Sequence, residues 1–195
     1  MRTHSSILSA FLLILVTTAM QAHAADAASW VPPGPAIGQS FPDALTLPDH
    51  GGKSQSLKAL RGKNGIALLF VRSADWCPFC KAQLVDVNKH LADFQQLGFN
   101  VVSVSMDTVD KIAGFHGERQ IGFTMLSDPK GDAVERLGIR DLQYADGSKA
   151  FGVARPMIFI LDATLTIRHK YAEESYRNRP DLGKVLADLR AAPHP

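Results

Sequence analysis

Two cysteines, Cys77 and Cys80, are the only ones in this 195-residue chain, and they are three positions apart. A disulfide between them would close a ring too small to remove much chain entropy, which is the usual structural benefit of such a bond. The spacing therefore favours a pair that stores and releases electrons reversibly. A zinc site needs four ligands, and the sequence has neither a second cysteine pair nor a histidine pattern to complete them. We predict redox chemistry at this pair and expect no metal and no cofactor.

A helix is predicted to begin at these cysteines. After Cys80, apolar residues recur every three or four positions, at Leu84, Val87, Leu91 and Phe94. Pro78 suits the first helical position, which leaves Cys77 at the N-cap, and Gly98 is expected to cap the other end. Free N–H groups and the helix dipole favour a thiolate at the N-cap. We therefore expect Cys77 to be the attacking sulfur and Cys80 the resolving sulfur.

The first 24 residues are predicted to be a signal peptide. Arg2 supplies a positive start, residues 7–16 are apolar, and Ala22-His23-Ala24 offers a small-residue cleavage site. The apolar run is shorter than the roughly 20 residues that a membrane span needs. We expect export to the bacterial periplasm or secretion without a membrane span after cleavage, with anchoring by an uncleaved signal as the alternative. Because exported thiols meet an oxidising compartment, a redox partner must set the state of the pair.

The remaining chain is predicted to be one domain. Without Arg2 the basic count falls from 21 to 20, against 19 acidic residues, and the sequence has no long basic run. Nucleic acid is therefore not expected as a partner. Residues 25–36, rich in Ala, Pro and Gly, are expected to be a flexible lead-in. Residues 37–195 are long enough to bury a core.

Helices and strands are predicted to alternate along this domain. Two apolar runs without alternation, at residues 66–71 and 100–106, indicate strands covered on both faces, and the helix between them predicts a right-handed parallel crossover. Residues 44–47 and 53–56 flank a Gly-containing turn and predict an N-terminal hairpin. Further strands are expected at 124–126, 157–161 and 165–170, and further helices at 107–120, 133–137 and 180–190. We predict a mixed α/β domain.

Several motifs resemble a known superfamily. Ala74-Asp75-Trp76-Cys77-Pro78-Phe79-Cys80, on a strand-to-helix turn, resembles the active site of the thioredoxin superfamily. Val-Ser-Met-Asp at 104–107, Leu-Ser-Asp-Pro-Lys-Gly at 126–131 and Met-Ile-Phe-Ile-Leu-Asp at 157–162 resemble its alkyl hydroperoxide reductase/thiol-specific antioxidant branch, the peroxiredoxin-like redoxins. The resemblance extends over about residues 37–189. It implies a thioredoxin-like three-layer sandwich, with a central mixed sheet flanked by helices and an N-terminal β-hairpin extension.

The same resemblance implies roles for residues around the pair. Pro156 is expected to carry a cis peptide bond opposite the cysteines, the other reading being an ordinary trans proline at the start of a strand. Arg155 is a candidate to polarise a peroxide, and Arg72 is a second candidate, whereas an ordinary ion pair is the alternative for each. Trp76 and Phe79 are expected to flank the sulfurs with apolar surface, although core packing explains Phe79 equally well.

Two departures from the family pattern bear on function. Peroxiredoxins typically place a proline and then a threonine or serine before the attacking cysteine, and Phe70 and Ala74 occupy these positions here. Ser73 is adjacent to the second position, so its hydroxyl is a candidate substitute. Thioredoxins often have a buried acid where this chain has Val71. An assisting carboxylate must come from elsewhere, and the sequence offers Asp75, which we expect to be exposed, and Glu118, which it does not place.

Three functions remain open, in this order. The first is a thiol–disulfide oxidoreductase of the cell envelope, in which Cys77 attacks a substrate disulfide and Cys80 resolves the mixed disulfide. The second is a peroxiredoxin-like thiol peroxidase, in which Cys77 becomes a sulfenic acid that condenses with Cys80. The third and most remote is a carrier of copper(I), a soft metal that thiolates suit. The expected partners are thiol or disulfide proteins, or a peroxide.

Overall fold

Two buried parallel strands form the centre of the sheet. The computed structural model describes residues 30–42 and 45–192. Within them, all six residues of β3 (Gly65–Phe70) are buried, as are six of the seven in β4 (Phe99–Ser105). These strands pair in parallel with Phe70 opposite Val104, and the chain crosses from one to the other through α2 (Pro78–Lys89). The predicted parallel crossover is confirmed.

Three more strands complete a mixed sheet of five, in the order β5-β4-β3-β6-β7. Of these, β5 (Thr124–Ser127) is parallel to β4, while β6 (Met157–Asp162) and β7 (Ile167–Ala172) run antiparallel to their neighbours. Their positions agree with the predicted strands to within two residues. The sheet therefore has the parallel and antiparallel halves that a mixed α/β domain requires.

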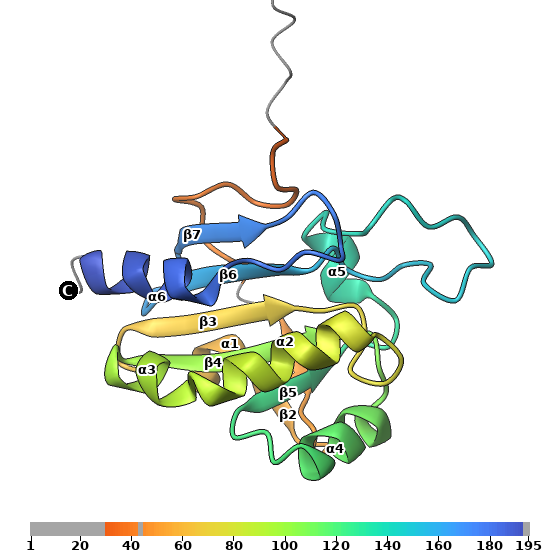
Figure 1. Cartoon of the computed structure of the whole chain (residues 1–195), viewed down its shortest axis with the longest axis horizontal. Coiled ribbons are helices and arrows are strands. Elements are labelled where there is room, and N and C mark those ends of the chain that lie inside the picture. The colour runs from red at the N-terminus through yellow and green to blue at the C-terminus, as the bar shows by residue number, and fades with distance from the viewer. Residues whose placement is uncertain (1–29, 43–44, 193–195) are drawn as a thin grey trace, which may run out of the picture.

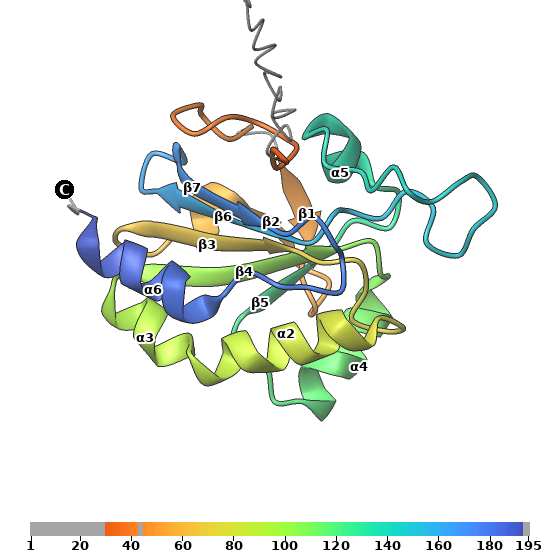
Figure 2. The ribbon, with the colours of Figure 1, turned by 45° about the horizontal axis from the view of Figure 1, so that its top comes forward.

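Helices cover both faces of this sheet (Figures 1 and 2). One face is covered by α2, α3 (Leu91–Gln96), α4 (Val109–Glu118) and α6 (Leu182–Ala191). The other face is covered by α5 (Asp132–Arg136), α1 (Leu57–Leu60) and the N-terminal hairpin of β1 (Thr46–Pro48) and β2 (Ser54–Ser56). The predicted three layers and the hairpin extension are confirmed.

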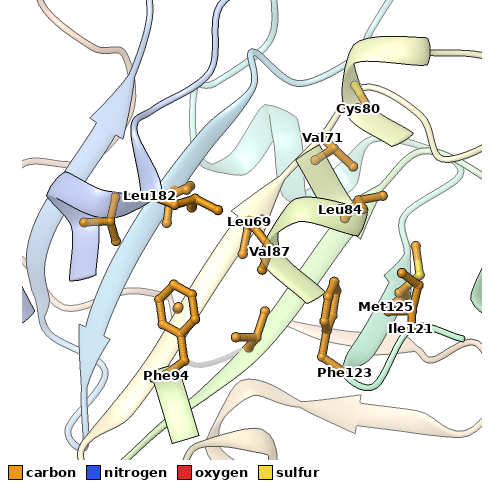
Figure 3. Close-up of a cluster of buried hydrophobic side chains, with 14 of the residues drawn as sticks. Leu69, Val71, Cys80, Leu84, Val87, Phe94, Ile121, Phe123, Met125 and Leu182 are labelled. Atoms are coloured by element: carbon orange, nitrogen blue, oxygen red, sulfur yellow. The ribbon is translucent and has the colours of Figure 1, made fainter. Parts of the chain in front are cut away.

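Alternate residues of β3 serve the two cores. Leu69 packs under α2 against Leu84 and Val87, whereas Leu68 packs on the opposite face with the hairpin and α5. Figure 3 shows Cys80 at one end of the cluster beneath α2, above Leu84. The cysteines therefore sit at the border of the main apolar core and not on an open surface.

The helix predicted to run from Cys80 to Gly98 is divided at His90. The backbone of His90, at φ −95° and ψ 9°, leaves the helical region, and its ring Nδ1 lies 3.1 Å from Asp93 Oδ2. A new helix, α3, starts at the next residue. Gly98 adopts a φ of +77° and donates its N–H to the Gln95 carbonyl at 2.9 Å, so the predicted glycine cap is correct.

Part of the predicted lead-in lies along β7. Lys170 Nζ donates to the carbonyls of Pro32, Pro33, Gly34 and Pro35 at 2.9 to 3.4 Å. The predicted signal peptide, and residues 25–29 of the predicted lead-in, lie outside the described residues. None of the helices in the described part of the chain is long and apolar enough to cross a membrane.

Leu84→Ala should lower the free energy of unfolding by about 2–5 kcal/mol, because it leaves a cavity between α2 and β3. Leu84 is 0% exposed, whereas Leu142 is 77% exposed and makes a matched control. Leu142→Ala should change the free energy by less than about 0.5 kcal/mol. Urea denaturation followed by circular dichroism measures both. Equal losses in the two variants would contradict this description of the core.

Candidate active site

The cysteine pair lies at the N-terminus of α2, as the sequence predicts. Cys77 is the N-cap, with an extended backbone, and Pro78 follows in the first turn. The Cys80 N–H donates to Cys77 Sγ at 3.3 Å, so the two sulfurs share the first turn of the helix. Both thiols are free, and the residues are 1% and 0% exposed. The geometry suits reversible formation of a disulfide between neighbours on one turn.

A buried network attaches the turn before the cysteines to the end of β4. Ser73 Oγ donates to Asp107 Oδ1 at 2.7 Å and accepts the N–H groups of Asp75 and Trp76. Asp107 Oδ2 accepts the Ala74 N–H at 2.6 Å and the Ser105 hydroxyl at 2.8 Å. The Ser73 hydroxyl is thus fully engaged in holding the turn. Ser73, the candidate substitute for the family's threonine or serine, thus holds the turn that carries the cysteines.

Asp107 has a role that the sequence analysis missed. The sequence predicts a helix over residues 107–120 with Asp107 or Thr108 as its cap, and Thr108 is the N-cap of α4. The carboxylate instead receives three hydrogen bonds, two of them from the turn that carries the cysteines. Asp107 is therefore the buried acid that fixes the turn. The spacing of the cysteines in the sequence does not identify this position.

A guanidinium group surrounded by aromatic rings lies beside the pair. Arg72 is 5% exposed, and its Cζ lies 5.1, 4.8 and 4.1 Å from the ring centres of Trp76, Tyr144 and Tyr176. Trp76 packs against the core cluster that includes both cysteines, as expected. Phe79 is 40% exposed and its ring meets Tyr176 edge-on, so it borders the site from outside. We call Arg72, Trp76, Tyr144 and Tyr176 the aromatic cluster.

A second guanidinium group reaches the sulfur of Cys80. Arg179 Nη2 lies 3.3 Å from Cys80 Sγ, while its Nη1 donates to the carbonyls of Tyr176 and Asn178. Arg179 belongs to the β7–α6 loop (residues 173–181), and Tyr144 belongs to the α5–β6 loop (residues 137–156). Both loops lie at the end of the sheet where α2 begins (Figure 1). The sequence analysis missed both residues.

Charge and hydrogen bonding shift the pKa values of the two thiols in opposite directions. The thiol of Cys77, the backbone at Ser73 and Arg72, and the Arg179 guanidinium together lower the pKa of Cys80 to about 6, although burial opposes this. The pKa of Cys77 is raised by its hydrogen bond with Cys80 and by burial. Because the two sulfurs share a hydrogen bond, ionisation of one thiol raises the pKa of the other. Arg179, which the sequence did not place, adds positive charge beside the pair.

Arg155 and Pro156 do not have the expected geometry. Arg155 Nη2 pairs with the buried Asp141 at 3.2 Å, and its Nη1 donates to the carbonyls of Glu173 and Glu174. It thus links the α5–β6 and β7–α6 loops, and these hydrogen bonds and this ion pair do not involve the sulfurs. The expectation of a cis bond before Pro156 was wrong, because this peptide bond is trans. Pro156 directly precedes β6, so its missing N–H falls outside the ladder and the lower-energy isomer fits.

Comparison with known proteins identifies the family of this chain. The model of the AhpC/TSA family matches residues 37–170. The chain belongs to the AhpC/TSA family. A putative peroxiredoxin of Mycobacterium tuberculosis is 33% identical over 119 residues, which cover 61% of this chain and 74% of the relative. Peroxiredoxin Bcp of Escherichia coli is 23% identical over 138 residues, covering 71% and 86% of the two chains.

Solved structures agree with the fold of this AhpC/TSA protein. The crystal structure of peroxidoxin BcpB from Mycobacterium tuberculosis has a TM-score of 0.69 at 24% identity and covers 80% of this chain and 96% of that one. Peroxiredoxin Q of Xanthomonas campestris has a TM-score of 0.66 at 22% identity, with 83% and 96% covered. The predicted thioredoxin-like fold, the redoxin branch and an enzyme that works through thiols are confirmed.

The remaining acidic candidates lie away from the sulfurs of this AhpC/TSA protein. The half-exposed Asp75 side chain pairs with Lys111 at 3.4 Å, which agrees with its predicted exposure. Glu118 is exposed and lines a shallow surface pocket beside Asp75. Among the described residues, no group of three or more His, Cys, Asp or Glu side chains is arranged to hold a metal ion.

Asp107→Asn should lower the free energy of unfolding by about 1–3 kcal/mol, because an amide NH2 would face buried donors in place of a carboxylate oxygen. Amide hydrogen exchange at residues 73–80 should become faster than in the wild-type protein. Asp110→Asn, an exposed position in the first turn of α4, is the matched control and should change neither quantity. Unchanged exchange at residues 73–80 in Asp107→Asn would show that the carboxylate does not hold the turn.

Proposed function

We propose that this protein is a thiol peroxidase that reduces a peroxide with the Cys77–Cys80 pair. The sequence analysis placed a disulfide oxidoreductase first and a peroxidase second. The names of the relatives, peroxiredoxins from bacteria, support the second function over the first. The AhpC/TSA match over residues 37–170 supports it as well, because it includes the turn, both cysteines and the strand after Pro156.

The burial of both sulfurs is the observation that carries this proposal. A protein disulfide must bring its own sulfur into line with an attacking thiolate, which requires an accessible sulfur. Cys77 and Cys80 are 1% and 0% exposed and are flanked by the aromatic cluster and Arg179. A peroxide, a small substrate, suits such a site much better than a folded protein chain does.

The surroundings of the pair also suit the chemistry of peroxide reduction. A thiolate attacks one peroxide oxygen and becomes a sulfenic acid, which then condenses with the neighbouring thiol to a disulfide. The hydrogen bond within the pair and the charge of Arg179 lower the pKa of Cys80, which favours one thiolate in the pair near neutral pH. Arg72 and Arg179 place positive charge where the leaving oxygen becomes negative. An external dithiol reductant, the predicted redox partner, must then return the pair to the thiol state.

Wild-type protein should consume hydrogen peroxide or cumene hydroperoxide with dithiothreitol as the reductant. Replacing both cysteines, as Cys77→Ser/Cys80→Ser, should reduce consumption to the rate of dithiothreitol alone, because no thiolate remains. A coupled peroxide assay measures both proteins. Replacing Ser54, an exposed serine of β2, by alanine serves as the control and should retain full activity.

Reduction of insulin disulfides separates the two leading functions. A peroxidase with buried sulfurs should reduce insulin no faster than dithiothreitol alone does. Rapid insulin reduction without peroxide consumption would return the assignment to a disulfide oxidoreductase.

We also propose that the protein is exported. The charged start at Arg2, the apolar residues 7–16 and the Ala22-His23-Ala24 site support this. Expressed from the full sequence in a bacterium, the protein should appear in the periplasmic fraction and begin at Ala25. Recovery from the membrane fraction with Met1 retained would favour the anchored alternative, and recovery from the cytoplasm would contradict export.

A further inference from the structure

We propose that residues 30–35, which we call the strap, hold the two active-site loops in place, and that Trp30 and Lys170 are positioning residues for the reaction. The proposal rests on the proposed peroxidase function and adds to it two side chains that lie outside the site. It does not depend on which of the two sulfurs attacks.

A single ammonium group joins the strap to the sheet. Lys170 of β7 donates from Nζ, at 2.9 to 3.4 Å, to the carbonyls of Pro32, Pro33, Gly34 and Pro35. Because proline has no N–H, this part of the chain cannot pair with β7 as a regular strand, and its carbonyls are bound by a side chain instead. Pairing with the sheet begins just after the strap, where the Gly38 N–H donates to the Ile167 carbonyl at 2.8 Å. In Figure 1 this orange segment lies along β7.

The strap also packs directly on the start of the α5–β6 loop. Gly34 has a φ of +86°, a conformation that favours glycine. A Cβ atom on Gly34 would lie 2.6 Å from Ile139 Cγ2 and 3.3 Å from the Leu137 carbonyl oxygen. The backbone of the strap therefore approaches this loop so closely that no side chain fits between them.

Trp30 connects the strap to the arginine that joins the two loops. The Cζ of Arg155 lies 5.5 Å from the ring centre of Trp30, within the range of a cation–π contact. The Arg155 side chain is only 16% exposed and pairs with Asp141 of the α5–β6 loop. It also donates to the carbonyls of Glu173 and Glu174 in the β7–α6 loop. The Trp30 ring thus stabilises the one guanidinium group that bonds to both loops.

The two loops carry side chains of the active site. Tyr144 of the α5–β6 loop lies against Arg72, and Arg179 of the β7–α6 loop contacts the Cys80 sulfur. A continuous series of contacts therefore runs from Lys170 and the strap, through Arg155 and the loops, to the cysteine pair. Release of the strap should loosen both loops without changing any residue at the sulfurs.

The two halves of the catalytic cycle should respond to such loosening in opposite directions. Reaction with peroxide needs the cations held beside the pair, where charge develops. Reduction of the Cys77–Cys80 disulfide needs a sulfur of the external dithiol to reach a sulfur that is 1% or 0% exposed. Looser loops should slow the first half-reaction and speed the second.

Trp30→Ala tests this prediction, because it removes the ring from Arg155. The reaction of the reduced protein with hydrogen peroxide should become roughly two- to fivefold slower, the range expected for loss of one cation–π contact. Reduction of the oxidised protein by dithiothreitol should become faster by a similar factor. Single-turnover assays that quantify free thiols measure both rates. Lys170→Met, which releases the four carbonyls, should change both rates in the same directions.

Conservative and matched variants separate positioning from a general loss of structure. Trp30→Phe keeps an aromatic ring over Arg155 and should restore most of both rates. Val31→Ala changes the next residue, which is 75% exposed, and Lys63→Met removes an exposed lysine, so neither should alter the two rates. Amide hydrogen exchange should become faster in Trp30→Ala at residues 137–156 and 173–181 and stay unchanged in β3 and β4.

Three results would contradict the proposal. Rates in Trp30→Ala and Lys170→Met that equal those of their controls would show that the strap does not act on the site. A fall in both rates, with faster exchange throughout β3 and β4, would show a general loss of stability. Unchanged exchange in the two loops would show that the strap does not hold them. If the wild-type protein consumes no peroxide, the peroxidase function fails, while loop exchange and disulfide reduction still decide whether the strap holds the loops.

Discussion

The hydrogen bonds from Ser73 and Ala74 to Asp107 are the interaction on which the rest of the site depends. They connect the turn after β3 to the end of the neighbouring parallel strand β4. Because carboxyl ends of parallel strands meet at one edge of a sheet, a carboxylate at the end of β4 can hold the turn that begins α2. The position of Cys77 as N-cap, of Cys80 one turn later and of Arg72 beside them follows from this one anchor.

The second constraint is positive charge that is not balanced by acids. Arg72 is nearly buried among Trp76, Tyr144 and Tyr176, whose ring faces stabilise a cation where water is excluded. Arg179 satisfies one nitrogen with backbone carbonyls and directs another at Cys80. Among the residues that the structure describes, neither of these two cations forms an ion pair with a carboxylate. The stabilised anion is then a thiolate, which is the form of cysteine that reacts.

Sequence reasoning succeeded where local pattern decides the structure. The apolar runs predicted β3 and β4, the alternation of helices and strands predicted the mixed sheet, and Pro78 predicted where α2 begins. It failed where contacts join distant segments. Tyr144 and Arg179 lie in loops without periodicity, and Arg179 is 99 positions from the sulfur that it contacts. The sequence indicated Asp107 only as a possible helix cap. Its hydrogen bond with Ser73 could not be predicted, because Ser73 is 34 positions away.

The different contacts of Arg155 and Arg179 follow from the geometry of the sheet edge. Arg155 comes from the start of β6 and is occupied by Asp141 and by the carbonyls of Glu173 and Glu174. By pairing in this way, it fixes the α5–β6 loop against the β7–α6 loop, and each of these loops supplies a side chain to the site. The guanidinium group at the Cys80 sulfur therefore comes from Arg179 in the β7–α6 loop. Arg155 holds this loop in place through the carbonyls of Glu173 and Glu174. The family resemblance indicated Arg155 because it precedes Pro156, but Arg155 pairs with Asp141, whereas Arg179 contacts the Cys80 sulfur.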